Sequence, residues 1–166
     1  AVVLSERLAR MPRDIRVCNG RLEGIPVKWL YGEKSSADFV ILYLHGGGFV
    51  LPAIKPHYSF CGMLALKTSS TVIMPSYRLA PEHPFPAGVE DCLAAYRWLL
   101  EHDYDPAKII IAGDSAGGNL TMTTVLGARN AGLPLPAAMI MLSPVFRFEE
   151  ASEGSHQENR EVEAML

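Results

Sequence analysis

Cysteine is scarce in this sequence, and the few cysteines present form no recognisable pattern. Three occur in 166 residues (Cys18, Cys61 and Cys92), widely spaced and odd in number. No CxxC pair or Cys/His cluster is present, so we expect neither a disulfide framework nor a structural metal site. The spacing favours free, mostly buried thiols in a reducing compartment, and we therefore predict a cytoplasmic protein.

The sequence also lacks an excess of positive charge and a long apolar run. Its formal net charge is −3, with Lys and Arg scattered along the chain, which gives no electrostatic basis for binding nucleic acid. No apolar run approaches the roughly 20 residues that a membrane-spanning helix needs. Residues 1–10 carry charge early and contain no apolar core of the kind found in signal peptides. We therefore expect no nucleic-acid partner and no membrane span.

What the sequence does contain is an alternation of short apolar runs and helical patterns. Two runs, 39–44 and 138–142, are apolar without alternation, which is typical of strands covered on both faces of a parallel sheet. Other strands are expected at 16–18 (weakly), 25–31, 71–76 and 108–112. Helices are expected at 57–68, 88–101 and 116–131. This order predicts an α/β fold with a doubly wound, mostly parallel sheet and flanking helices.

The most informative stretch is a Gly-x-Ser-x-Gly sequence between a strand pattern and a helix pattern. Its residues are Gly113, Asp114, Ser115, Ala116 and Gly117. A serine that acts as a nucleophile needs its Oγ held out on a sharp turn, and flanking glycines allow both the turn and a close approach of the helix. Ser115 is therefore the candidate nucleophile. We expect Asp114 to brace the turn rather than to act as the catalytic acid.

A second glycine-rich stretch follows the strand expected at 39–44. It reads His45, Gly46, Gly47, Gly48 and Phe49. A loop without Cβ atoms can turn its N–H groups into a pocket, and such a pocket stabilises the negative charge that develops on a carbonyl oxygen during acyl transfer. We expect the N–H groups of Gly47 and Gly48 to donate hydrogen bonds to this oxygen, with the Ala116 N–H as a third donor. We expect His45 to support the glycine backbone rather than to act as a base.

A proline-rich segment at 76–87 connects the next strand and helix. Three prolines within six positions make this connection rigid. Within it, Arg78 and Glu82 are candidates for an ion pair, and Asp91 in the following helix is expected to anchor the segment. We interpret the segment as scaffold beneath the site and assign His83 a structural role.

Three motifs together resemble the hormone-sensitive-lipase-like (HSL family) carboxylesterases of the α/β-hydrolase fold. They lie at 45–49 (HGGGF), 77–82 (YRLAPE) and 113–119 (GDSAGGN), and the resemblance runs from about residue 15 to residue 144. It implies hydrolysis of a small-molecule, short-chain carboxylic ester without a cofactor. It also implies Ser115 as nucleophile, and Gly47, Gly48 and Ala116 as the donors of an oxyanion hole.

The same resemblance implies a catalytic Asp and His on loops after later strands. After Ser115 the sequence contains no Asp, and its one His is His156. We therefore expect a partial α/β-hydrolase fold with its C-terminal strands missing, completed by the rest of the same protein or by another chain. The apolar run 138–142 supports this, because soluble proteins rarely leave such a strand at an exposed edge. We expect the chain alone to be inactive or very weakly active.

The expected organisation is a core at 1–148 followed by a polar segment at 149–166. Residues 1–14 are interpreted as a possible remnant of an N-terminal cap. The segment at 149–166 is either the start of a cap or lid or a disordered tail. Two other functions stay open, namely a non-catalytic ligand-binding relative and another serine hydrolase such as a peptidase or a thioesterase.

Overall fold

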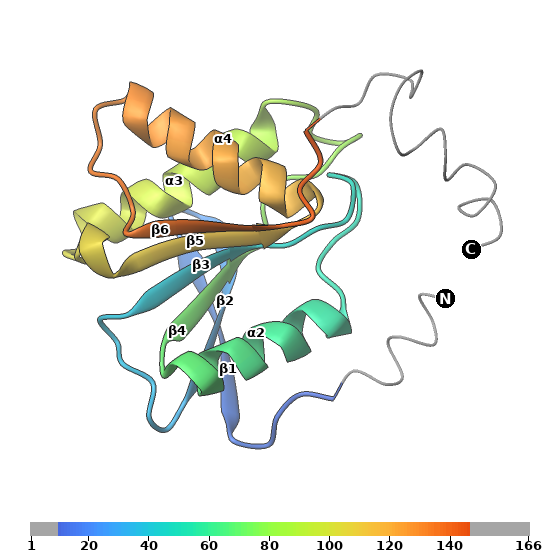
Figure 1. Ribbon diagram of the computed structural model, residues 1–166. Coiled ribbons are helices and arrows are strands. Elements are labelled where there is room, and N and C mark those ends of the chain that lie inside the picture. Colours follow the sequence, from blue (N-terminus) through green and yellow to red (C-terminus); the bar gives the residue numbers. More distant parts are fainter. Residues whose placement is uncertain (1–9, 147–166) are drawn as a thin grey trace, which may run out of the picture.

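The centre of the molecule is a six-stranded sheet, in a computed structural model that describes residues 10–146 (Figure 1). Its strands are β1 (Ile15–Leu22), β2 (Ile25–Gly32), β3 (Val40–Leu44), β4 (Thr71–Pro75), β5 (Ile109–Asp114) and β6 (Ala138–Leu142). They lie in the order β1-β2-β4-β3-β5-β6. β2 runs antiparallel to both of its neighbours, whereas β4, β3, β5 and β6 are parallel to one another. The predicted mostly parallel sheet is confirmed.

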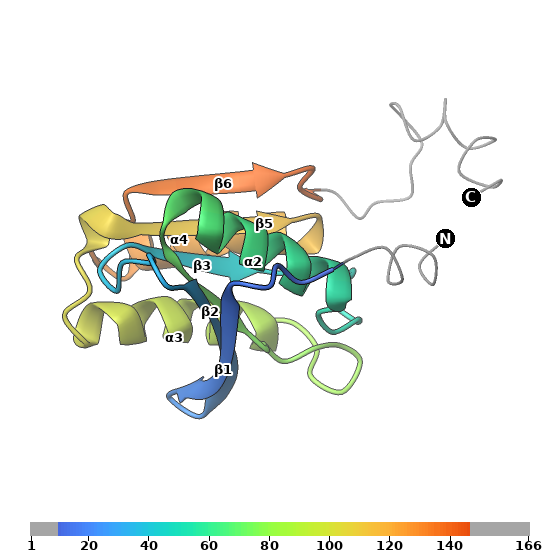
Figure 2. The same ribbon diagram turned by 90° about the horizontal axis from the view of Figure 1, so that it is seen from below.

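Helices cover both faces of this sheet (Figures 1 and 2). Helix α2 (Lys55–Thr68) packs on β2 and β4, and the opposite face carries α3 (Ala87–Glu101) and α4 (Ala116–Asn130). A short 3-10 helix, η1 (Pro106–Lys108), precedes β5. The sheet is therefore doubly wound, as predicted, and the helix patterns at 57–68, 88–101 and 116–131 are confirmed to within two residues at each end.

The central strands have the composition that burial on two faces requires. Every residue of β3 and β4 is buried, and both strands are rich in aliphatic side chains. Alternate residues of β3 serve opposite layers: Leu42 and Leu44 belong to the core under α3 and α4, and Ile41 and Tyr43 to the core under α2. Tyr43 is therefore a buried aromatic side chain whose hydroxyl needs a partner.

β6 forms one edge of the described sheet. It pairs with β5 on one side only, and Met139 and Ile140 remain 41% and 46% exposed. The strand predicted at 138–142 is thus present, and within residues 10–146 it has the exposed, uncharged edge that soluble proteins normally avoid.

The three cysteines are unpaired, with Cys61 and Cys92 buried and Cys18 exposed. Within residues 10–146, no helix combines the length and the apolar content needed to cross a bilayer. The polar segment expected at 149–166, and most of the cap remnant expected at 1–14, lie outside the described residues.

Candidate active site

The two glycine-rich motifs leave neighbouring parallel strands at the same edge of the sheet. In the register of β3 and β5, Leu44 lies opposite Gly113. The loop that begins at His45 and the turn at Ser115 therefore start side by side, at the carboxyl ends of their strands. This edge is where open α/β sheets place their ligands.

Ser115 occupies a sharp turn between β5 and α4, in a backbone conformation that residues other than glycine rarely adopt. Its φ is 50° and its ψ is −118°. The turn is held from both directions, because the Ser115 N–H donates to the Leu142 carbonyl at 2.9 Å and the Val145 N–H donates to the Ser115 carbonyl at 3.2 Å. Ser115 is half-buried, so the surrounding chain fixes its backbone without covering the residue completely.

The flanking glycines are required by close backbone contacts. A Cβ on Gly117 would collide with the carbonyl oxygen of Leu44, and a Cβ on Gly113 would collide with the Gly117 carbonyl. On Gly118 it would lie 2.8 Å from Cβ of Pro144. The first turn of α4 can therefore approach β3 only because these positions carry no side chain.

The glycine loop after β3 uses conformations that suit glycine. Gly47 and Gly48 have φ angles of 128° and 63°. The Gly47 carbonyl accepts hydrogen bonds from the N–H groups of Val50 and Leu51, at 3.2 Å and 2.9 Å, so the loop turns back on itself. Gly48 is exposed. The loop thus presents backbone, rather than side chains, beside the Ser115 turn.

Asp114 connects the loop to the turn. Its Oδ1 accepts hydrogen bonds from the Tyr43 hydroxyl at 2.8 Å and from the Gly46 N–H at 2.9 Å. Burial raises the pKa of the Asp114 carboxyl, but the facing His57 ring, the Tyr43 hydroxyl and the Gly46 amide outweigh this and hold the pKa below its usual value. Asp114 is therefore a carboxylate at neutral pH, and it fixes the first glycine of the loop.

His57 completes this cluster from the first turn of α2. Its Nδ1 accepts a hydrogen bond from the Ile54 N–H at 3.0 Å, so we assign the ring proton to Nε2. Nε2 lies 3.6 Å from Asp114 Oδ2. Both ring nitrogens are therefore engaged within the protein.

His45 lies beneath the glycine loop and is 2% exposed. Its Nδ1 donates to the Gly46 carbonyl at 2.7 Å, and its ring stacks on Tyr77 with the centroids 4.5 Å apart. The Tyr77 hydroxyl donates to the His45 carbonyl at 2.6 Å. Burial lowers the pKa of His45, so the ring is neutral, and it supports the loop through the Gly46 carbonyl while packing on Tyr77.

The proline-rich segment is anchored by Asp91 of α3, as predicted. The Asp91 carboxylate accepts hydrogen bonds from the Arg78 N–H at 2.8 Å and from its guanidinium at 2.7 to 3.0 Å. The expected pairing of Arg78 with Glu82 is wrong, because the guanidinium turns toward α3 and also contacts Glu90 at 3.2 Å.

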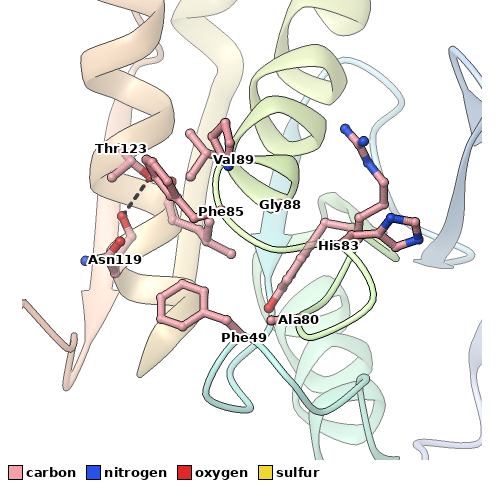
Figure 3. Close-up of a pocket in the computed structure, with 12 residues that line it drawn as sticks. Phe49, Ala80, His83, Phe85, Gly88, Val89, Asn119 and Thr123 are labelled. Atoms are coloured by element: carbon pink, nitrogen blue, oxygen red, sulfur yellow. Dashed lines mark hydrogen bonds between the residues drawn. The ribbon is translucent and has the colours of Figure 1, made fainter. Parts of the chain in front are cut away.

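A cavity of about 500 Å³ lies between this segment, α3 and α4 (Figure 3). Ala80, His83 and Phe85 of the segment line it, together with Phe49 of the glycine loop and Asn119 of α4. The interpretation of the segment as scaffold alone is therefore incomplete, since part of it forms a cavity wall. Ser115 does not line this cavity, although Asn119 is one helical turn away from it.

Sequence reasoning did not find Tyr43 and His57 as parts of the site. Tyr43 carries the one side-chain hydroxyl in the aliphatic strand β3, and a buried hydroxyl signals an unseen partner. His57 gives no comparable signal. Within residues 10–146, no three His, Cys, Asp or Glu side chains gather as a metal site requires. His156, the one His after Ser115, lies outside the described residues.

Comparisons with known proteins agree with this fold. A family model described as alpha/beta hydrolase fold matches residues 41–166. The crystal structure of an esterase from the bacterial hormone-sensitive lipase (HSL) family superposes with a TM-score of 0.90 at 41% identity, covering 96% of this chain and 53% of that one.

Curated relatives have related names. An acetyl-hydrolase of Streptomyces hygroscopicus is 40% identical over 126 residues, which cover 76% of this chain and 42% of the relative. Esterase LipI of Mycobacterium tuberculosis is 44% identical over 99 residues, which cover 57% of this chain and 31% of the relative. The chain thus spans about half the length of these relatives or less. By fold, motifs and similarity, it belongs to the hormone-sensitive-lipase-like carboxylesterases of the α/β-hydrolase fold.

Proposed function

We propose that this chain carries the nucleophile and the oxyanion hole of a carboxylesterase acting on small, short-chain esters. The observation that supports this most directly is the adjacency of the Ser115 turn and the glycine loop on neighbouring parallel strands, with Asp114 hydrogen-bonded to Gly46 between them. The reaction needs no cofactor, because the nucleophile and the charge-stabilising groups all come from protein.

In the proposed reaction, Ser115 Oγ attacks the ester carbonyl carbon while a base takes the hydroxyl proton. The carbonyl oxygen becomes an oxyanion, which accepts hydrogen bonds from the N–H groups of Gly47, Gly48 and Ala116. The intermediate collapses and expels the alcohol, which receives the proton from the base. Water then attacks the acyl-serine in the same way, releasing the carboxylic acid and restoring Ser115.

Two features suit these amides to the role. Ala116 is the first residue of α4, so its N–H lies at the positive end of the helix dipole. Gly47 and Gly48 adopt positive φ angles in a loop fixed from below by His45 and from the side by Asp114. Amides held in place before the reaction stabilise a developing charge without the cost of reorganisation.

We further propose that the base and its acid partner do not come from this chain. His57 has both ring nitrogens engaged, and His45 is buried beneath the loop. No Asp follows Ser115 in the sequence. Hydrolases that lack triad members retain roughly 10³- to 10⁴-fold catalysis over water through the oxyanion hole and binding alone, so we expect the isolated chain to be very weak.

Chemical rescue tests both parts of the proposal. The chain is treated with an alkyl fluorophosphonate, with and without imidazole as an external base, and the modified residue is located by mass spectrometry. We expect slow labelling of Ser115 that imidazole accelerates, and none in Ser115→Ala. Rapid turnover of p-nitrophenyl butyrate without imidazole would contradict the absence of a base.

A folded chain whose Ser115 stays unlabelled even with imidazole would instead favour the alternative, a non-catalytic ligand-binding relative. The observation that keeps this alternative in view is that His45 and His57, the two histidines beside the glycine loop, are both held by other groups of the protein. We also propose a cytoplasmic location, which the three unpaired cysteines support.

A further inference from the structure

The glycine loop is the first part of a longer segment, residues 46–54, that lies between β3 and α2. At the start of this segment, the Gly46 N–H donates to Asp114 Oδ1 at 2.9 Å. At its last residue, the Ile54 N–H donates to His57 Nδ1 at 3.0 Å. Each end is therefore held by a side chain that lies outside the segment.

The two side chains that hold these ends also face each other. His57 Nε2 lies 3.6 Å from Asp114 Oδ2. Asp114 Oδ1 already accepts from the Tyr43 hydroxyl and the Gly46 N–H, so Oδ2 is the oxygen that is left for His57. A flexible segment resists having its ends held together, because this reduces its conformational entropy. The attraction between His57 and Asp114 opposes that tendency.

Movement of this pair would be passed directly to the loop. A Cβ on Gly46 would collide with Asp114 Oδ2, so the carboxylate lies against the loop backbone itself. The side chains of His57 and Asp114 are only 16% and 29% exposed, and charges that are partly buried are screened less by salt than charges at the surface. A shift of the Asp114 carboxylate would therefore shift Gly46 and, with it, the amides that follow.

His57 also has a local role in α2, which explains one of its contacts but not the other. It occupies the third position of the helix, and its side chain accepts the N–H of the residue that caps the helix, Ile54. This cap requires Nδ1 alone. It gives no reason for Nε2 to face Asp114, whereas a role in holding the loop accounts for both ring nitrogens.

We propose that His57 is a positioning residue of the oxyanion hole, which acts through Asp114 on the glycine loop. Its Nε2–H side holds the Asp114 carboxylate against Gly46, and its Nδ1 holds the far end of the segment. The amides of Gly47 and Gly48 then keep the orientation that stabilises an oxyanion. The inference rests on the proposed function, and extends it to a residue that does not touch the substrate. A misplacement of about 1 Å in such a site can lower the rate about 100-fold.

Two substitutions separate this role from that of a helix cap. His57→Gln can still direct an N–H group toward Asp114 from about the place of Nε2. His57→Asn keeps an acceptor near the place of Nδ1 but is too short to reach Asp114. The matched control is His102→Asn, because His102 Nδ1 also contacts a backbone carbonyl, that of Trp98 at 2.9 Å, but lies at the opposite edge of the sheet beside Lys108.

The rate of Ser115 labelling tests the effect on the reaction. The full 166-residue chain and its variants are treated with a concentration series of the alkyl fluorophosphonate in the presence of imidazole. We expect His57→Asn to lower the maximal rate constant at least about tenfold without changing the half-saturating concentration. His57→Gln should recover most of the rate, and His102→Asn should match the wild type. A folded His57→Asn that is labelled as fast as the wild type, or His57→Gln that is as slow as His57→Asn, would overturn the proposal.

Hydrogen exchange of the Gly46 amide tests the same role without any reaction. Exchange should be at least about tenfold faster in His57→Asn and unchanged in His57→Gln and His102→Asn, because only the first variant releases the loop. Wild-type exchange in folded His57→Asn would contradict the proposal. His57→Glu, whose charge repels Asp114, replaces His57→Asn in both measurements if that variant does not fold. If Ser115 of the wild type stays unlabelled while exchange responds as expected, the proposed hydrolysis fails and the role of His57 in holding the loop stands.

Discussion

The two ends of α4 use glycine for different reasons. At the start of the helix, Gly113 and Gly117 stand where any Cβ would collide with backbone atoms of a neighbouring segment. Near its end, a Cβ on Gly127 would have side-chain atoms of Leu93 as its nearest neighbours, with Cδ2 closest at 3.2 Å, and a Cβ on Gly132 would meet nothing within 4 Å. Glycine is therefore a steric requirement at the first end. At the second end Gly127 is replaceable, and Gly132 serves only the backbone turn, where its φ is 69°.

The polar contacts of the two ends differ as well. Near the start of α4, the Tyr43 hydroxyl and the Gly46 amide converge on the charged carboxylate of Asp114. Beyond its end, the Tyr96 hydroxyl donates to the neutral Pro134 carbonyl at 2.8 Å. The close backbone contacts and the hydrogen bonds to a charged group thus lie at the end of α4 that carries Ser115, and we expect the far end to tolerate more substitutions.

Gly117→Ala should produce the largest effect. Its Cβ would meet the Leu44 carbonyl, which belongs to a buried central strand and cannot move aside. We expect the free energy of unfolding to fall by at least about 3 kcal/mol, the upper part of the range for overpacked sites. Urea denaturation followed by circular dichroism measures this. A loss below 1 kcal/mol would mean that α4 can move away from β3.

Tyr43→Phe and Tyr96→Phe compare the two polar contacts directly. Both side chains are buried, and each variant removes one hydroxyl donor. Bonds to charged groups contribute about 1.5–3 kcal/mol and neutral ones about 0.5–1.5 kcal/mol, so the Tyr43 variant should be the less stable of the two. The same denaturation experiment ranks them. Equal losses would show that the Asp114 carboxylate is as well satisfied without Tyr43.

Asp114→Asn should change how stability depends on pH. The folded-state pKa of Asp114 lies below its ordinary value of 3.8, so its contribution is fully present above that value and is lost as the pH falls through the folded-state pKa. Asn keeps an acceptor for the Gly46 N–H but does not titrate. We therefore expect the urea midpoint to fall less between pH 5 and pH 3 in the variant than in the wild type. Parallel curves would show that Asp114 is not stabilised as a carboxylate.

Gly127→Ala should have the smallest effect on the free energy of unfolding, and unlike Gly117→Ala it should not destabilise the protein. The contacting Leu93 Cδ2 is the end of a flexible side chain, and Ala is favoured over Gly inside a helix by about 1 kcal/mol. We expect stability to stay unchanged or to rise by up to about 1 kcal/mol in thermal denaturation. A clear loss would remove the contrast between the two ends of α4.

Much of the fold could be predicted because its elements carry strong local patterns. The unbroken apolar runs at 39–44 and 138–142 indicate parallel strands, and the helical spacing in 88–101 indicates α3. The weak run at 16–18 underestimates β1, which extends over eight residues. Its side chains are mostly exposed, so the pattern lacks the hydrophobic signal on which such a prediction depends.

The site is predictable only where its chemistry is local. Ser115 and the glycine loop are contiguous motifs, whereas the cluster around Asp114 joins residues 57 and 71 positions apart in sequence. Arg78 shows the same limit, since its nearer sequence neighbour Glu82 is the wrong partner and Asp91 is the right one. Contacts of this kind depend on how the helices are placed on the sheet, which no single segment specifies.

The two hydrogen bonds that join the Ser115 backbone to the Leu142 carbonyl and the Val145 N–H have a consequence for how the protein is made. During synthesis, the Gly-x-Ser-x-Gly sequence leaves the ribosome well before the residues that hold its turn in place. Both bonds can form only after the chain has been extended to residue 145, three residues beyond β6. Ribosome-bound intermediates that end before residue 142 would therefore contain the nucleophile without its support.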